Sequence, residues 1–131
     1  MIRKTLLAAA LSTATFAAAP AFAGGQVSID IAPATQEQDD AMRLGLGMYG
    51  LFNGIKNAGI KQKGSGNSAG VAQNGSGNLG IVHQEGNGHN GTVSQNGNCN
   101  AYGLFQFGKN TNANVEQNGD CQTGATVQFG W

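Results

Sequence analysis

The sequence has little charge. Only 11% of its 131 residues are charged, against about 25% in soluble domains. Glycine, with 22 residues, and the uncharged amides of asparagine and glutamine take the place of charge, above all after residue 60. Such a chain has little apolar surface to offset the entropy lost on ordering. Composition alone therefore favours a disordered, low-complexity segment, and only a regular pattern overturns that prediction.

An export signal is predicted at the N-terminus. Arg3 and Lys4 give a positive start, residues 6–19 form an uncharged alanine-rich run, and residues 21–23 have the small-x-small pattern of a cleavage site. The run is shorter than the ~20 residues that a membrane span needs. We therefore expect residues 1–23 to be a secretory signal peptide and the mature chain to begin at Gly24, in an oxidising compartment.

Basic patches and catalytic groupings are missing as well. Beyond residue 23, five basic residues stand against seven acidic ones, a net charge of −2. The chain thus offers no surface for nucleic acid or an anionic membrane. His83 and His89 fall at an outward and an inward phase, so we expect no metal pair. No GxxxxGK[ST] loop occurs. The sequence predicts neither an enzyme nor a cofactor.

A unit of eleven residues recurs seven times in the second half of the chain. Each unit has glutamine at one phase: Gln62, Gln73, Gln84, Gln95, Gln106, Gln117 and Gln128. Two residues later comes a glycine: Gly64, Gly75, Gly86, Gly97, Gly108, Gly119 and Gly130. Two residues before each glutamine lies Ile60, Val71, Val82, Val93, Leu104, Val115 or Thr126. Such regularity indicates a repeat architecture.

The repeat predicts an all-β fold. Its conserved phases alternate, which is typical of strands with one face turned to an interior, and its Asn-Gly and Gly-x-Gly segments suit turns. Two strand-turn units would close one coil of 22 residues. We therefore predict a β-solenoid of cross-β type, in which each strand pairs in register with the strand 22 residues on, about 4.8 Å away.

Three domains follow from the repeat. Residues 1–23 are the signal peptide, residues 24–44 a flexible N-terminal segment and residues 45–131 the solenoid, with 45–51 as a candidate degenerate strand. Thr35 and Gln38 have the spacing of a helix cap, although we expect coil there. The last solenoid strand has no capping helix in sequence, so we expect bare sheet edges that favour end-to-end addition.

An inward glutamine is explained by stacking. Buried amides are costly unless they form hydrogen bonds, and identical amides in register donate to one another along the axis. Carboxylates at that spacing would repel. The seven glutamines, together with Asn67, Asn78 and Asn100 at the inward asparagine phase, are therefore the predicted ladder residues, and the glycines after each glutamine are the predicted turn residues.

Two further features depend on the register. One outward face carries apolar residues, among them Leu79, Ile81 and Phe105, and its occupant is a neighbouring fibril, the N-terminal segment or an adhesive surface. Cys99 and Cys121 are 22 residues apart at one phase, which places their Cα atoms about 4.8 Å apart, within the disulfide range. A disulfide between them is expected; free thiols and an intermolecular bond are the alternatives.

The repeat resembles that of a known family. Residues 62–73 read Gln-Lys-Gly-Ser-Gly-Asn-Ser-Ala-Gly-Val-Ala-Gln, which is similar to the Gln-x-Gly-x-Gly-Asn-x-Ala-x-x-x-Gln core of the curlins. The resemblance extends over residues 45–131. It implies a subunit of curli, extracellular amyloid fibres of bacterial biofilms. It also implies partners: further copies of the chain, other curlin subunits, an outer-membrane secretion channel that reads residues 24–44, and adhesion surfaces.

Several units depart from the family pattern. His89 and Thr111 replace the asparagine, while Cys99, Asn110 and Cys121 replace the second glycine. Whether the chain is the bulk subunit or a minor nucleating or surface-anchoring one therefore stays open. A monomeric binding solenoid is a further alternative, but it would need a regular outward array of threonine or aromatic residues. Thr92 and Thr123 do not supply one.

Overall fold

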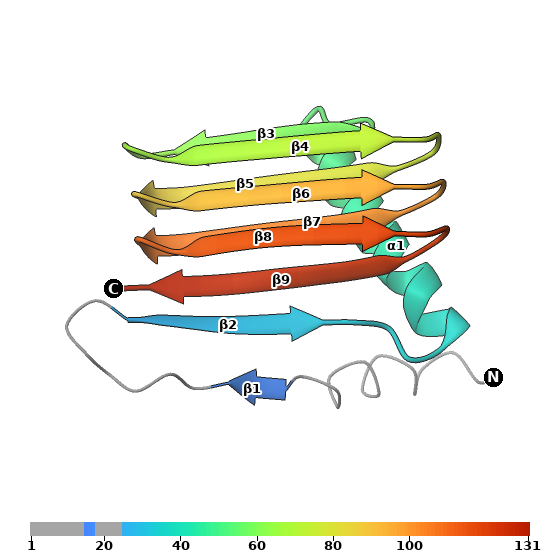
Figure 1. Cartoon of the computed structure of the whole chain (residues 1–131), viewed down its shortest axis with the longest axis horizontal. Coiled ribbons are helices and arrows are strands. Elements are labelled where there is room, and N and C mark those ends of the chain that lie inside the picture. Colours follow the sequence, from blue (N-terminus) through green and yellow to red (C-terminus); the bar gives the residue numbers. More distant parts are fainter. Residues whose placement is uncertain (1–14, 18–24) are drawn as a thin grey trace.

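The computed structural model describes residues 15–17 and 25–131, which form a β-solenoid with one helix along its side (Figure 1). Apart from residues 15–17, the predicted signal peptide lies outside the described residues. Sheet A contains, in spatial order, β1 (Thr15–Ala17), β2 (Gln26–Ile31), β9 (Thr123–Gly130), β7 (Ala101–Lys109), β5 (Leu79–Asn87) and β3 (Ala58–Lys63). Sheet B contains β4 (Ser68–Asn74), β6 (Asn90–Asn96) and β8 (Asn112–Asn118). The predicted all-β solenoid is confirmed.

Solenoid strands pair in parallel with the strand two places on, always 22 residues away. Val71 lies opposite Val93, and Gln62 lies opposite Gln84. The inward apolar phase fills the space between the two sheets, where Val82, Val93 and Leu104 are at most 1% exposed. Their branched side chains pack well on a pleated surface. Repetition of one short pattern thus produces both the coil and its core.

The two glycine phases of each turn have different causes. Gly75, at the first phase, has φ 117°, and a Cβ there would lie 1.9 Å from the carbonyl oxygen of Gly97 in the next coil. Gly77, at the second phase, has φ 68° but no heavy atom within 3.7 Å of such a Cβ. The second phase therefore requires left-handed backbone without excluding a side chain. The residues that replace glycine there, each with φ between 54° and 60°, are Cys99, Asn110 and Cys121.

Gly130 differs from the other predicted turn glycines. It is the last residue of β9, opposite Gly108 of β7 and Gln26 of β2. Positive φ occurs at the other six predicted turn glycines: Gly64, Gly75, Gly86, Gly97, Gly108 and Gly119. The expectation of a turn at Gly130 is therefore wrong, because β2 extends the ladder at that point.

The segment before the repeat is helical, which corrects two expectations. Helix α1 (Gln36–Phe52) includes residues 45–51, which we expected as a strand, and residues 36–44 of the segment that we expected to be flexible. Thr35 caps it, since its hydroxyl accepts the backbone N–H of Gln38 at 3.2 Å. Met42, Leu46 and Tyr49 recur at helical spacing and pack on sheet A. Helix α1 is not long and apolar enough for a membrane span, and the described residues contain no other candidate.

Strand β2 covers the edge that we expected to be bare. It pairs antiparallel with β9 over six residue pairs, and residues 15–17 pair in turn with β2. In the described part of the chain, sheet B ends at β8 and nothing pairs with the far edge of that strand. The two sheets therefore differ at this end of the solenoid, because sheet A is closed by β2 whereas sheet B is open.

Candidate assembly interface

Two ladders of glutamine amides run along the solenoid axis. In each pair of glutamines 22 residues apart, Nε2 of the earlier residue donates to Oε1 of the later one at 2.8–2.9 Å. Four residues form the ladder of sheet A, and three form that of sheet B: Gln62, Gln84, Gln106 and Gln128 in the first, Gln73, Gln95 and Gln117 in the second. Gln84, Gln95 and Gln106 are 0% exposed. The structure thus contains the amide stack that the spacing predicts.

The second amide hydrogen of each inner glutamine joins the two sheets. Gln84 donates it to the carbonyl of Ser68 at 2.8 Å, and Gln95 donates to that of Leu79 at 2.9 Å. Each of these carbonyls lies 16 residues earlier, on the facing sheet. Both N–H donors are therefore satisfied. Sequence reasoning missed this role, which a carboxylate cannot fill because it has no donor.

The ladders have a direction, so their two ends differ chemically. Within the described residues, Oε1 of Gln62 and of Gln73 accepts no hydrogen bond, although both residues donate onward. At the opposite end, Gln117 uses one N–H for the carbonyl of Ala101 at 3.3 Å and retains a second. One end of the solenoid therefore presents amide acceptors and the other presents an amide donor.

The inward asparagines stack through the backbone rather than through one another. Asn100 accepts the backbone N–H of Gln122 and donates to the carbonyl of Gly119, both at 2.9 Å. Asn67 and Asn78 accept the backbone N–H of the residue 22 positions on and donate to a turn glycine in the same way. The shorter asparagine side chain reaches the turn backbone, so the predicted side-chain ladder is replaced by bridges between coils.

A histidine at the inward asparagine phase likewise contacts the next coil and the turn backbone. His89 is 1% exposed, and its Nδ1 lies 2.7 Å from Oγ1 of Thr111, the residue that follows in the column. Its Nε2 lies 3.2 Å from the carbonyl oxygen of Glu85. The two departures from the asparagine pattern therefore compensate each other across neighbouring coils.

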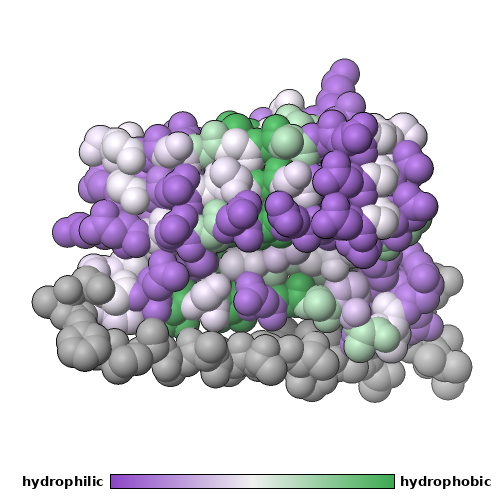
Figure 2. All heavy atoms as spheres, in the orientation of Figure 1, coloured by the Kyte–Doolittle hydropathy of each residue, from purple (hydrophilic) through white to green (hydrophobic). Residues whose placement is uncertain are grey.

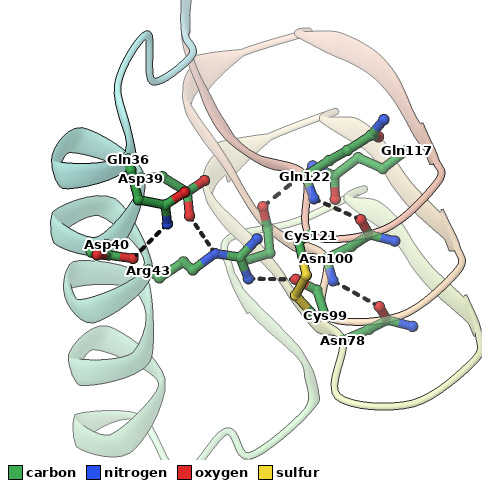
Figure 3. A network of polar contacts seen from close by, with 11 residues as sticks. Gln36, Asp39, Asp40, Arg43, Asn78, Cys99, Asn100, Gln117, Cys121 and Gln122 are labelled. Carbon is green, nitrogen blue, oxygen red and sulfur yellow. Dashed lines mark hydrogen bonds and ion pairs between the residues drawn. A yellow bond between two sulfur atoms is a disulfide. The ribbon is translucent and has the colours of Figure 1, made fainter.

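A disulfide joins two neighbouring coils, and an arginine connects them to the helix (Figure 3). Cys99 and Cys121 are bonded, with Cα atoms 4.5 Å apart. Arg43 of α1 donates through Nε to Asp39 at 2.7 Å and through Nη1 to the carbonyl oxygen of Cys99. Arg43 was missed in the sequence, where it was only one of five basic residues. Its sole signal was its place between the apolar residues Met42 and Leu44.

The N-terminal segment occupies the apolar outward face of sheet A. Leu46 of α1 is 6% exposed and packs on Ile81, which is 0% exposed. The Tyr49 ring meets that of Phe105 edge to face, with centroids 5.3 Å apart. The face is covered by helix α1, which combines the end of the expected N-terminal segment, with Met42, and residues 45–51, which we had assigned to the solenoid.

Tyr49 also forms a hydrogen bond with His83 beneath the helix. Burial lowers the pKa of His83, and the nearby Lys61 charge lowers it further, while Glu85 acts in the opposite direction. Burial raises the pKa of Tyr49. His83 therefore favours its neutral form, in which one ring nitrogen accepts from the tyrosine hydroxyl.

Strand β2 matches β9 on both faces. On the outward face Val27 lies opposite Phe129 and Ile29 opposite Val127. On the inward face Thr126 donates to Asp30 at 2.7 Å. An inward-pointing charge at a sheet edge is a known protection against further strand addition. Strand β2 is therefore complementary to the edge that it covers, and it places a carboxylate at the inward phase.

These features define a class of protein: a β-solenoid of 22-residue coils, held by buried amide ladders and glycine turns. The family model for the curlin-associated repeat matches residues 57–79, which span one coil from β3 to the start of β5. This coil is therefore similar to the curlin-associated repeat. No curated protein and no solved structure gives a significant match.

Proposed function

We propose that the chain is a secreted structural subunit that self-assembles into extracellular, curli-like amyloid fibres of a biofilm matrix, with a role in adhesion. The observation that carries this proposal is the direction of the glutamine ladders, which among the described residues leaves unused acceptors at Gln62 and Gln73 and an unused donor at Gln117. Unmatched polar groups at the two ends are satisfied when copies stack end to end. The curlin-repeat match supports the same role.

The remaining features of the proposal concern export. Residues 1–23 act as the signal peptide to the periplasm, and residues 24–44 are the leader that an outer-membrane channel reads. Other curlin subunits join the fibre, and its surface adheres to cells or solids. No step of this role requires a cofactor or catalysis. Secretion is tested by fusing residues 1–44 to a reporter and measuring its appearance outside the cell.

Assembly is tested with purified protein. We expect a lag and then growth of thioflavin fluorescence, a shorter lag when sonicated fibres are added, and fibres that diffract with a meridional reflection at about 4.7–4.8 Å. A protein that stays monomeric with flat thioflavin fluorescence, with and without seeds, would contradict the proposed function.

A further inference from the structure

The edge of β8 borders a slot one strand wide. Among the described residues sheet A has β9 and then β2 beyond β7, while sheet B stops at β8. The space beside β8 forms a groove of about 460 Å³, lined by Val115 and Glu116 of β8, Thr126 of β9, and Ser28 and Asp30 of β2. Figure 2 shows the surface hollowed between β8 and β2. The slot lies where the next strand of sheet B would pair with β8.

We propose that the open edge of β8 is the docking site for β3 of a second copy of this chain. This inference rests on the proposed function and adds the strand, the register and the orientation of the junction. The second copy enters as the continuation of the solenoid, with the phases of the eleven-residue unit kept across the junction.

The step between successive strands selects β3 rather than β4. Strand β4 lies half a coil beyond β3, just as β9 lies half a coil beyond β8 (Figure 1). If β4 of the second copy paired with β8, β3 of that copy would coincide with β9. With β3 on β8, β4 of the second copy lies directly beyond β9, and neither strand overlaps a strand of the solenoid.

The ladder chemistry agrees with this register. Gln117 has a spare amide donor, and Gln62 has a spare acceptor. In the proposed junction Gln117 of one copy donates to Gln62 of the next, which is the donor-to-acceptor direction of every glutamine pair inside the chain. Val115 then meets Ile60 of the second copy, which continues the inward apolar column.

Charge complementarity distinguishes the two ends further. The residue of the second copy that faces Glu116 is Lys61. Both side chains are exposed in the single chain, and Lys61 Nζ has only the Asn53 amide oxygen at 2.7 Å as a described partner. Opposite charges directly across neighbouring strands attract, and like charges there repel. The pair therefore favours β3 against β8 specifically.

The junction fixes the orientation of neighbouring copies. Since β3 belongs to sheet A and continues sheet B of its neighbour, each copy is rotated by half a turn about the solenoid axis. Successive α1 helices then lie on opposite sides of the fibre. Strand β2 does not block the first contact, which is made on β8, but it must leave β9 before β4 of the second copy pairs there.

Charge reversal at the two positions tests the junction. Lys61→Glu and Glu116→Lys each place like charges across the junction. Each variant alone should therefore elongate seeds made of the same variant on the order of ten-fold more slowly than wild type elongates wild-type seeds. A mixture of the two restores opposite charges at every junction, and growth should recover, as it should in the double variant. Lys56→Glu, which makes the same charge change just outside β3, is the matched control and should grow as wild type does.

Each outcome decides something different. Recovery in the mixture, with a slow rate for each variant alone, supports β3 on β8. Wild-type fibres that grow normally, together with no recovery in the mixture, overturn the junction and leave the proposed function in place. Wild-type protein that forms no fibres overturns both.

Discussion

At the level of single residues, each turn of the solenoid has two glycine phases with different requirements. The first, as at Gly75, lies against a carbonyl oxygen of the next coil, so that no side chain fits. The second, as at Gly77, needs only the left-handed backbone. That distinction explains why cysteine and asparagine occur at the second phase and never at the first in this chain.

Paired substitutions in one turn test this reading. Gly75→Ala should lower the free energy of unfolding by about 3 kcal/mol or more, because its methyl group meets the backbone of the next coil. Gly77→Asn should cost less than about 1 kcal/mol, because asparagine tolerates left-handed backbone. Urea unfolding of both variants measures the difference. Equal losses would show that the close approach at Gly75 is unimportant.

The more deeply a ladder glutamine is buried, the more its replacement should lower the free energy of unfolding. Gln95→Glu buries a charge at a position that is 0% exposed and removes both donors, so we expect a loss of about 3 kcal/mol or more. Gln62→Glu makes the same change at an exposed position and should cost less than about 1 kcal/mol. The two variants are compared by urea unfolding at neutral pH. A similar loss at both sites would contradict the buried ladder.

At the scale of elements, α1 and β2 are the parts of the chain that the repeat does not specify. Helix α1 contains Gly45, Gly47 and Gly50, each of which weakens a helix by about 0.5–1 kcal/mol relative to alanine. Its stability therefore depends on packing against sheet A. Both elements cover surfaces of the solenoid, α1 the apolar face and β2 the edge of β9.

The contact between α1 and β5 should weaken in acid. Burial lowers the pKa of His83 in the folded chain. When α1 leaves sheet A, His83 has an ordinary pKa near 6.5 and binds a proton more readily. The stabilisation is therefore complete above about pH 6.5 and is lost as the pH falls through the lowered pKa. Hydrogen exchange of the α1 amides at about pH 7.5 and about pH 5 measures this.

His83→Gln is the control for that experiment. The glutamine cannot titrate, so the exchange of α1 in this variant should change less between the two pH values. Equal pH dependence in the variant and the wild type would rule out His83 as the cause.

Strand β2 should have to leave β9 for a fibre to grow. Ile29 and Val127 are paired across β2 and β9, so Ile29→Cys with Val127→Cys allows a disulfide that holds the strand in place. The cross-linked protein should grow fibres at least about ten-fold more slowly, since every junction needs a released β9 edge, and growth should resume on reduction. Reduced wild type is the control, because reductant also opens Cys99–Cys121. Undiminished growth of the cross-linked protein would contradict release of β2.

The parts that could be predicted from the sequence are those that repeat. Strand, turn and register of the solenoid follow from seven copies of one unit, where each copy checks the others. Residues 45–51 occur once, and Tyr49 fits both the strand phase and a helical stripe with Met42 and Leu46, so packing on sheet A decides between them. The pairing of β2 with β9 joins residues about a hundred positions apart, and no local pattern specifies it.

The candidate interface also contains some features that follow from the repeat and others that do not. The glutamine amides follow from the spacing, because identical side chains in register have one obvious partner. The backbone carbonyl that accepts the second amide hydrogen, as Leu79 does for Gln95, depends on how the two sheets face each other. The asparagine bridges and the Arg43 contact depend in the same way on turn geometry and on the docked helix.

For the whole molecule, the central claim is that folded solenoids stack along one axis. In such a fibre, a given residue recurs once per chain, that is, once per seven strands, or about 17 Å along the axis at about 4.8 Å per coil. In a fibre of extended chains stacked in register, the same residue recurs about every 4.8 Å. The two architectures therefore differ in the distance between identical residues of neighbouring copies.

The most direct test is the distance between spin labels at one site in the fibre. Thr92 faces outward on β6, and because Cys99 and Cys121 are bonded, Thr92→Cys gives a single reactive thiol. Stacked solenoids predict labels about 17 Å apart or farther, with separate spectral lines. A single exchange-narrowed line, from labels about 4.8 Å apart, would contradict the account.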